Sequence, residues 1–487
     1  MDYQVATGTA PAGRASPAPK QARIALHAFA ALAIAACAFL NWRFILVHFS
    51  DGGYLLDSGW FAHLMWSGDL SLPNPRSIAD FSYYNMHVAP YLALFGMPFG
   101  AAGLDPFAIF ALHEGLMFGL LALALYLTVA SAGRGWVALA LAAAALLVAT
   151  ASNLVWRITG YPHFEIATVA LCVSGAALLL AGRPRLAALP LALALTVRED
   201  AGFFVALYLA GAAMMRMRSP LDWRTALCAP ELPWAIAAGL VSVALFWIKG
   251  QFFFRYPTFQ NTFSGHGWEH LSWPWLGVRL GGLVQDVKID LTIAAVAVLG
   301  AISWRYLVYP ALILPLVVAQ LLAVQDGIGL FHSYYGIPWL VVWSGLLIVA
   351  AFRLRRGEAG PAEAVAALVL AFGCSLAVPN FGNGWRDLWI LRHAITHPTV
   401  DLPALKRELE TAMGSDAADV CLSTGAVALV PDAVRPRQAI THRKDLAHCG
   451  RIFLFRDDFD YRQLRDKVLA EGRRQGPTIG DRIETYF

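Results

Sequence analysis

Long apolar runs recur along most of this chain, and they limit its fold more than any other feature. A helix needs about 20 apolar residues to cross a bilayer. Of the 487 residues, 58% are apolar and 14% are charged, against about 45–50% and about 25% in soluble domains. One soluble core cannot hold this excess, because cores stop growing near ~250–300 residues. A purely soluble enzyme, a disordered protein and a fibrous protein are therefore excluded. Candidate spans are 24–47, 106–130, 135–152, 164–182, 185–198, 201–216, 232–250, 289–304, 307–324, 335–352 and 362–379.

We therefore expect an all-α polytopic membrane protein with about eleven transmembrane helices. Short basic clusters between the runs predict its topology, since Lys and Arg favour the cytoplasmic side. With the N-terminus inside, every cluster lies in the cytoplasm, provided that 88–104 is a short outer-face or re-entrant helix rather than a span. The net charge of +4 is too small to indicate nucleic acid. The clusters are Arg134; Arg183 and Arg185; Arg216, Arg218 and Arg224; Arg305; and Arg353, Arg355 and Arg356.

This topology divides the chain into a disordered cytoplasmic tail at 1–23, a transmembrane domain at 24–380 and a small extracytoplasmic α/β domain at 381–487. The first outer loop covers 48–105. We expect a multi-pass membrane protein with its N-terminus in the cytoplasm and its C-terminus outside.

The polar C-terminal segment has its own pattern of elements. Residues 401–413 have helical spacing, and the runs DVCLSTGAVALV and GRIFLF are typical of short strands. A further helix is expected to open at DDFDYRQLRDKVLAEG. Cys421 and Cys449 each lie at a predicted strand, and outside the cell they would be in an oxidising compartment. They could pair there in a disulfide, and the sequence leaves free thiols as the alternative. No C-x-x-C spacing indicates a zinc or iron–sulfur site.

Ionisable residues concentrate at the predicted outer ends of the spans, where they suggest function. Asp57, in LLDSGWFAHLMW, is placed to act as a general base that deprotonates a hydroxyl. The alternative is a helix N-cap. Asp51 is the second candidate for the base, although Asp before Gly-Gly is more typical of a turn.

Three consecutive charges, Arg198, Glu199 and Asp200, interrupt an apolar stretch from 186 to 215. Arg198 is suited to binding a phosphate through two hydrogen bonds, and Glu199 or Asp200 would anchor it or a metal ion. The alternative is a hairpin tip that holds charges only for solvation.

Five further residues complete the predicted substrate site. His87 would donate a hydrogen bond to a phosphate or sugar, or else cap a helix. His163 and Glu165 would bind a metal or orient an acceptor, or else form an interfacial polar pair. His332 and Tyr335, with the neighbouring Tyr334, precede a span and would close over a lipid phosphate.

The order of five short runs resembles a known bacterial membrane family, domain of unknown function 2079. The runs are LLDSGWFAHLMW, MHVAPYLALFGMPFG, YPHFEIA, TVREDAGFFVAL and FHSYYGIPWL, and the later CLSTGAVALVPDAVRPRQA and CGRIFLFRD also resemble that family. That family is similar to C-type glycosyltransferases, multi-span enzymes that use polyprenyl-phosphate sugars at the outer face. The resemblance implies an essential acid at Asp57 or Asp51 and a lipid-phosphate contact at Arg198, where the family more often has Lys. The paired acids of many such enzymes are absent from the first loop.

The leading hypothesis is therefore sugar transfer from a polyprenyl-phosphate donor to an outer-face glycan, lipid or protein acceptor. The resemblance implies the bacterial inner membrane, within the cell envelope, as the location. Membrane lipids are the expected surroundings, and no nucleic acid is expected. The sequence indicates no definite cofactor and leaves a divalent metal open. A transporter or lipid flippase of cell-envelope precursors is the alternative; a flippase would place charge near the midplane. A non-catalytic assembly or sensor protein is the third hypothesis.

Overall fold

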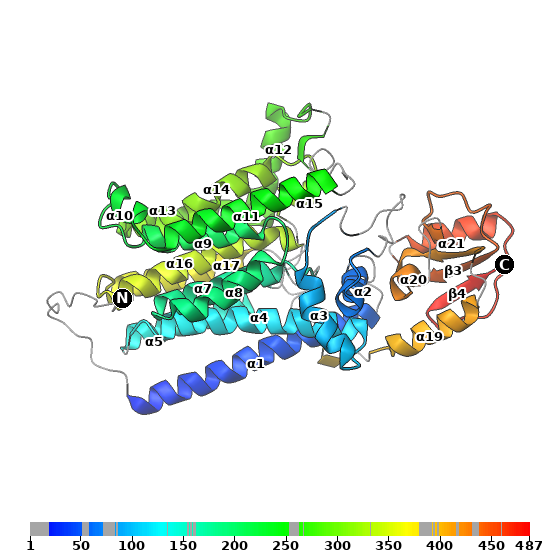
Figure 1. Ribbon diagram of the computed structural model, residues 1–487, viewed down its shortest axis with the longest axis horizontal. Coiled ribbons are helices and arrows are strands. Elements are labelled where there is room, and N and C mark those ends of the chain that lie inside the picture. Colours follow the sequence, from blue (N-terminus) through cyan, green and yellow to red (C-terminus); the bar gives the residue numbers. More distant parts are fainter. Residues whose placement is uncertain are drawn as a thin grey trace.

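The computed structural model is mostly helical, with a small sheet near the C-terminus (Figure 1). The helical part comprises α1 Lys20–Ser50, α2 Ser58–Ser67, α3 Tyr91–Ala101, α4 Pro106–Ala130, α5 Trp136–Ala151, α7 Ile166–Leu180, α8 Pro184–Leu195, α9 Ala201–Met214, α10 Trp223–Leu227, α11 Glu231–Phe252, α12 Trp273–Asp286, α13 Ile289–Ile302, η3 Trp304–Leu307, α14 Val308–Leu321, α15 Asp326–Gly329, η4 Ser333–Gly336, α16 Ile337–Arg355 and α17 Pro361–Ala377. The structure describes residues 19–50, 58–71, 83, 86–133, 135–152, 155, 158, 162–252, 263–265, 267–331, 333–378, 392, 395–396, 399–414, 418–430, 438–458 and 460–487.

Each of the eleven predicted runs contains a helix, but not all of these helices are long. Among the described residues, five helical stretches have the length and apolar composition needed to cross a membrane. The chain is thus a helical protein with several candidate spans, while eleven spans stay a prediction. The 15 residues of α7 rise only about 22 Å, short of the roughly 30 Å hydrocarbon layer. The five stretches are Lys20–Val47, Pro106–Ala130, Glu231–Phe252, Trp304–Leu321 and Asp326–Arg355.

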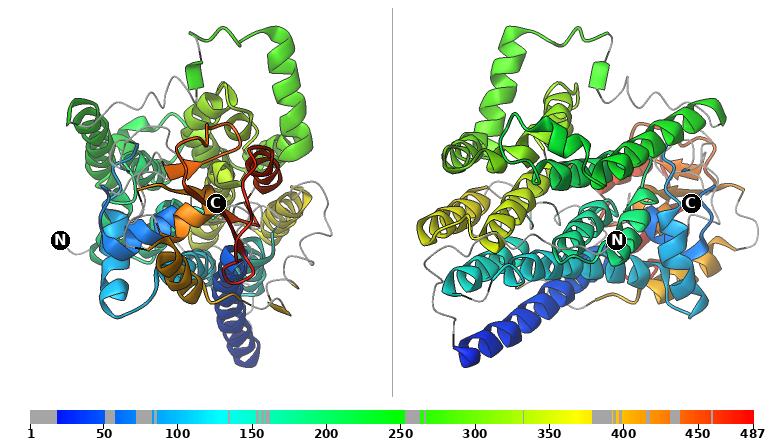
Figure 2. Two further views of the ribbon diagram at one scale, coloured as in Figure 1. Left: turned by 90° about the vertical axis from the view of Figure 1, so that its right-hand side faces the viewer. Right: turned by 60° about the vertical axis from the view of Figure 1, so that its left-hand side comes forward.

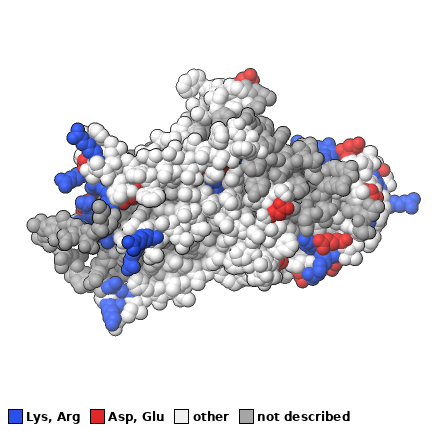
Figure 3. Space-filling view, in the orientation of Figure 1, with Lys and Arg blue, Asp and Glu red and all other residues white. Residues whose placement is uncertain are grey.

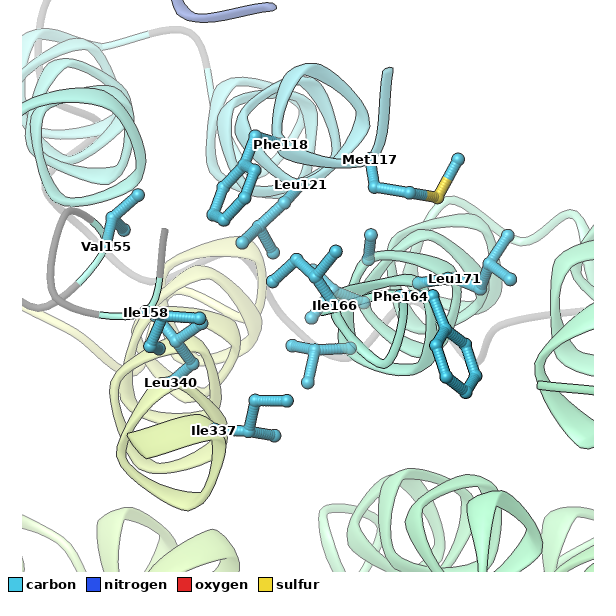
Figure 4. Close-up of a cluster of buried hydrophobic side chains, with 14 of the residues drawn as sticks. Met117, Phe118, Leu121, Val155, Ile158, Phe164, Ile166, Leu171, Ile337 and Leu340 are labelled. Atoms are coloured by element: carbon cyan, nitrogen blue, oxygen red, sulfur yellow. The ribbon is translucent and has the colours of Figure 1, made fainter. Parts of the chain in front are cut away.

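The long helices run side by side around α16 (Figures 1 and 2). Almost every residue of α16 from Ile337 to Ala351 is buried. Figure 4 shows Phe118 and Leu121 of α4, Ile166 of α7 and Ile337 of α16 around a common core. These helices are apolar on all sides, as expected when one face meets other helices and the other meets lipid.

Small residues let α9, α14 and α16 approach closely. A side chain on Gly345 of α16 would meet Tyr309 Cβ of α14 at 2.4 Å, and one on Gly211 of α9 would meet the Tyr309 ring at 2.7 Å. Glycine at both positions therefore makes room for one buried tyrosine, the packing that membrane helices favour.

The first loop also forms helices. A short helix within 88–104 is present as α3 and lies at one end of the bundle beside α2 (Figure 1). Helix α2 begins at Ser58, where the N-cap alternative for Asp57 expected a helix to start. Asp105 caps α4 by accepting hydrogen bonds of 3.0 Å from the N–H groups of Phe107 and Ala108.

The C-terminal domain is a four-stranded sheet with helices. It contains α19 Leu402–Met413, β1 Val420–Ser423, α20 Thr424–Leu429, β2 Ala439–Ile440, β3 Arg451–Phe455, α21 Tyr461–Ala470 and β4 Ile483–Tyr486. The strand order is β2-β1-β3-β4, parallel except for β4.

Several C-terminal predictions are confirmed and one is wrong. The helix at 401–413 and the strand in GRIFLF are present. The structure also settles a question that the sequence left open, since Cys421 and Cys449 form a disulfide with a Cα–Cα distance of 5.5 Å. The run DVCLSTGAVALV was expected to be a strand throughout. Its second half is instead helix α20. The first turn of α20 is held by a distant residue, because Asp458 Oδ1 accepts a 2.7 Å hydrogen bond from the Gly425 N–H.

The C-terminal domain lies at the end of the bundle that carries α2 and α3 (Figure 1). The ammonium of Lys406, on α19, lies 5.7 Å from the ring centre of Trp66, on α2. Figure 3 shows Lys and Arg side chains gathered at the opposite end of the bundle. On the visible face, the region between the two ends of the molecule carries almost no charged side chains.

Candidate functional site

The candidate site is built around the loop between α8 and α9. The loop holds Arg198, Glu199 and Asp200, and Asp200 immediately precedes α9. Its Thr196 carbonyl accepts a 2.9 Å hydrogen bond from the N–H of Tyr91, the first residue of α3. The three charges are therefore tied to the first loop and do not simply face solvent.

Glu199 is the centre of one charge group and is only 2% exposed. Its Oε1 lies 2.9 Å from His87 Nδ1 and 3.3 Å from Lys249 Nζ, and its Oε2 accepts a 2.9 Å bond from the N–H of Val88. Lys249 also donates to the Met86 carbonyl. Burial alone would raise the pKa of the Glu199 carboxyl, but His87, Lys249 and Arg198 outweigh it and hold this pKa well below its usual range. The Glu199 side chain therefore stays ionised, and its hydrogen bonds hold it in place.

Arg198 is the centre of a second group. Its Nε donates to Asp200 Oδ1 at 2.8 Å, one terminal nitrogen donates to Asp200 Oδ2, and the other donates to Glu165 Oε1 at 2.5 Å. A guanidinium has five N–H donors, so two are left over from these bonds. Burial would lower the pKa of Arg198, but the carboxylates of Asp200 and Glu199 outweigh it and raise this pKa, so the guanidinium keeps its charge.

Three ring side chains lie beside Glu165, and we call His163, Tyr334 and Tyr335 the aromatic wall. His163 contacts the Glu165 carboxylate, and its ring stacks on Tyr334 with 4.1 Å between ring centres. The Tyr334 hydroxyl donates to the Tyr335 hydroxyl at 2.6 Å. Ser58, the first residue of α2, donates a 2.8 Å bond to the carbonyl of Pro162, which precedes His163. The start of α2 is thus fixed against this wall.

These groups enclose a polar pocket of about 200 Å³. It is lined by His87, Glu165, Thr168, Arg198, Asp200, Phe204, Phe263, Leu316, Gln320, Ile328, Tyr334, Tyr335, Ile337 and Pro338. We call this the polar pocket.

An apolar groove of about 540 Å³ lies next to the polar pocket, between α9, α11 and α14. The two cavities share Asp200, Phe204 and Leu316, and this apolar groove has almost no other polar lining. One elongated molecule with a polar head and an apolar tail would occupy both cavities. The other lining residues of the apolar groove are Phe203, Ala206, Leu207, Ala210, Leu232, Ala235, Ile236, Leu312, Ile313 and Pro315.

The predicted site residues are distributed in three ways. Five line the polar pocket: His87, Glu165, Arg198, Asp200 and Tyr335. Glu199 and His163 lie behind it and hold His87 and Glu165. The remaining three, Asp51, Asp57 and His332, lie outside the described residues.

Two residues of this region were missed by the sequence reasoning. Lys249, near the end of α11, bonds Glu199. Gln320, near the end of α14, lines the polar pocket, and its Oε1 has no hydrogen-bond partner among the described residues. A polar side chain inside an apolar run is the signal that would have found both.

The described residues do not assemble an obvious metal site here. Glu165 and Asp200 are bridged by Arg198, which takes three of their four carboxylate oxygens, and the fourth contacts His163. Within the described part of the chain, three closely grouped metal-type ligands occur only at Cys421, His448 and Cys449, and there the two sulfurs are bonded to each other.

The geometry therefore describes a charged, partly enclosed pocket that opens beside an apolar groove at one end of a helical membrane protein. Comparison with protein-family models, with curated proteins and with solved structures finds no match to this chain.

Proposed function

We propose that this protein is a membrane glycosyltransferase that moves a sugar from a polyprenyl-phosphate donor to an acceptor at the end of the bundle carrying the polar pocket. The observation that carries the proposal is the junction of the polar pocket and the apolar groove at Asp200, Phe204 and Leu316. A lipid-linked sugar has the same two parts, a polar head and a long apolar chain.

The apolar groove fits the lipid chain of such a donor. It is lined by aliphatic and aromatic side chains of three helices that also expose apolar residues outward, such as Phe203, Ile236 and Leu314. Burial of apolar surface contributes about 25 cal/mol per Å². A polyprenyl chain entering from the bilayer would therefore bind without crossing water.

The polar pocket fits the head of the donor. Arg198 keeps two N–H groups for the lipid phosphate, and charge-assisted bonds of this kind are the strong ones. The Oε1 of Gln320, which has no hydrogen-bond partner among the described residues, is suited to a sugar hydroxyl, because a buried polar atom gains most from a partner it otherwise lacks. Tyr335, whose hydroxyl accepts from Tyr334, lines the polar pocket beside it.

The proposed reaction is a displacement at the anomeric carbon. An acceptor hydroxyl oxygen forms the new bond to that carbon, the bond from the carbon to the lipid-phosphate oxygen breaks, and the bonding electrons leave with the phosphate. Arg198 stabilises the charge that develops there. The hydroxyl proton passes to a general base.

Two residues are candidates for that base. The sequence favours Asp57, whose neighbour Ser58 is bonded to Pro162. The described geometry favours His87, because Glu199 holds its Nδ1 and its Nε2 is left for substrate. A carboxylate that orients an imidazole in this way recurs in enzymes that use His as a base.

Transport of a lipid-linked precursor is the alternative function. A flippase must offer a polar path from one leaflet to the other, with charge near the midplane. The polar pocket is instead built from helix ends at one end of the bundle, and the apolar groove beside it carries a single charged residue, Asp200. This distribution favours chemistry at one face.

The test is incubation of the purified protein with radiolabelled polyprenyl-phosphate sugars and a cell-envelope extract. Label should move from lipid to a polymer, protein or lipid acceptor. Arg198→Lys should slow the transfer, whereas Arg185→Lys, at an exposed arginine outside the polar pocket, should not. Movement of labelled lipid between the leaflets of a vesicle without sugar transfer would instead establish the transporter.

A further inference from the structure

A second charged cavity lies at the opposite end of the bundle from the polar pocket. It measures about 590 Å³ and is lined by Arg216, Arg218, Ser219, Asp222, Thr225 and Arg356. We call it the arginine pocket. Arg216 follows α9 and Arg198 precedes it, so the 14 residues of α9 separate the two sites by about 20 Å.

The arginines of this cavity are not equally engaged. Arg216 bonds Glu231 at 3.0 and 2.5 Å, and Arg356 bonds Glu358 at 2.9 Å. The guanidinium of Arg218 makes no hydrogen bond or ion pair within the part of the chain that the structure describes. Arg218 is attracted by the Asp222 carboxylate of the same pocket, but no hydrogen bond or ion pair to a described residue holds its guanidinium, whereas Arg216 and Arg356 are each held by a glutamate.

The loop that carries Arg218 is held in place by Asp222. One oxygen of Asp222 accepts the backbone N–H of Arg218 at 3.1 Å, and the other accepts the Thr225 hydroxyl at 2.9 Å. These bonds lower the pKa of the Asp222 carboxyl, so it stays ionised. Asp222 thereby fixes the loop and leaves the Arg218 side chain available to a ligand.

Apolar side chains beside this loop point to a membrane surface. Leu221, Trp223 and Leu227 are 85%, 56% and 57% exposed, and the Arg224 guanidinium lies 5.6 Å from the Trp223 ring centre. Exposed tryptophan next to arginine is typical of the lipid headgroup region. The short helix α10 therefore suits the interface between headgroups and acyl chains, at the depth of the arginine pocket.

We propose that the arginine pocket binds the phosphate of an anionic lipid headgroup. Arg218 supplies its guanidinium charge, Arg216 and Arg356 add flanking donors, and Ser219 and Thr225 add hydroxyls. Basic pockets between membrane helices recognise phosphate headgroups in this way. A soluble phosphate has the same head chemistry but lacks the acyl chains that would contact Leu221 and Leu227.

The experiment is native mass spectrometry of the delipidated full-length protein mixed with equal amounts of phosphatidylglycerol and phosphatidylethanolamine. Phosphatidylglycerol adducts should predominate. The Arg218→Gln variant lacks one arginine contact and should therefore show about fivefold fewer phosphatidylglycerol adducts. Arg218→Lys should retain most of the binding because the charge remains. Arg185→Gln, which removes an exposed arginine outside the arginine pocket, should behave like the wild type.

Two results would overturn the proposal. One is equal retention of phosphatidylglycerol by Arg218→Gln and Arg185→Gln when both variants remain monodisperse. The other is displacement of the bound lipid by millimolar inorganic phosphate, which would identify a soluble phosphate as the ligand. This test uses no transfer reaction, so its outcome is independent of the proposed glycosyltransferase activity.

Discussion

Glu199 Oε1 and His87 Nδ1 lie 2.9 Å apart although 112 residues separate them in the chain. The same carboxylate accepts the Val88 N–H and contacts Lys249. Three segments are thus joined by one buried side chain. The imidazole is held with one nitrogen against a carboxylate and the other toward the polar pocket.

The first prediction concerns the base. If His87 accepts the acceptor proton, His87→Gln should lower kcat by about 10²–10⁴-fold with little change in KM for the donor. Glu199→Gln should also lower kcat and shift the pH profile, because the imidazole loses its orienting charge. Asp57→Asn is the comparison variant. A large loss in Asp57→Asn with full activity in His87→Gln would assign the base to Asp57.

The second prediction concerns the apolar groove. Ala210 lines it, and Ala210→Phe should fill part of the space for the lipid chain. KM for a long-chain polyprenyl-phosphate donor should rise about tenfold, because ~1.4 kcal/mol of burial would be lost. KM for a short-chain water-soluble donor should not change. Equal effects on the two donors would contradict a lipid chain in the apolar groove.

A third prediction tests helix packing. Gly345→Ala should lower the free energy of unfolding by about 1–3 kcal/mol, because the new Cβ would meet Tyr309 Cβ at 2.4 Å. Gly373→Ala is the matched control, since that helical glycine of α17 has open space around it. Thermal unfolding in detergent should show a lower Tm for the first variant and an equal or higher Tm for the second.

The disulfide gives a fourth prediction. Replacement of Cys421 and Cys449 by serine should destabilise the C-terminal domain by about 3 kcal/mol, since the bond closes a loop of 28 residues. Limited proteolysis should then cut residues 401–487 faster, as it should in wild-type protein treated with a reductant. Cys228→Ser, at an exposed free cysteine, should leave the cleavage rate unchanged.

The fifth prediction is a pH dependence of the C-terminal domain. Burial raises the pKa of the Asp458 carboxyl to about 7, against hydrogen bonds from Ser423 and Gly425 that lower it. The protonated form is therefore favoured in the folded state more than in the unfolded chain. Its stabilising contribution is complete below the ordinary pKa of 3.8 and is lost as the pH rises toward 7.

Hydrogen exchange of β1 and β3 should accordingly speed up as the pH rises from 4 to 7, after correction for intrinsic exchange. Asp458→Asn should flatten this dependence, because an amide keeps an acceptor for the Gly425 N–H but does not titrate. A variant with the same pH slope as the wild type would show that another group is responsible.

Much of the fold was predictable because its signals are local. Runs of apolar residues placed a helix in each of the eleven intervals, and the interrupted run at 88–104 correctly gave a short helix. The periodicity of 401–413 and the cluster in GRIFLF predicted α19 and β3. Each of these depends on residues within about ten positions of one another, so the chain alone carries the information.

The sequence also marked Arg198, Glu199 and Asp200 as charges that an apolar segment must accommodate, but it could not choose their partners. Only the packing of α3, α7 and α11 decided that Glu199 holds His87 and Lys249 while Arg198 joins Glu165 to Asp200. Packing likewise brought an apolar groove to the edge of that cluster. Hydropathy is a property of each residue and its neighbours, whereas an ion pair between distant segments depends on how helices come together in three dimensions.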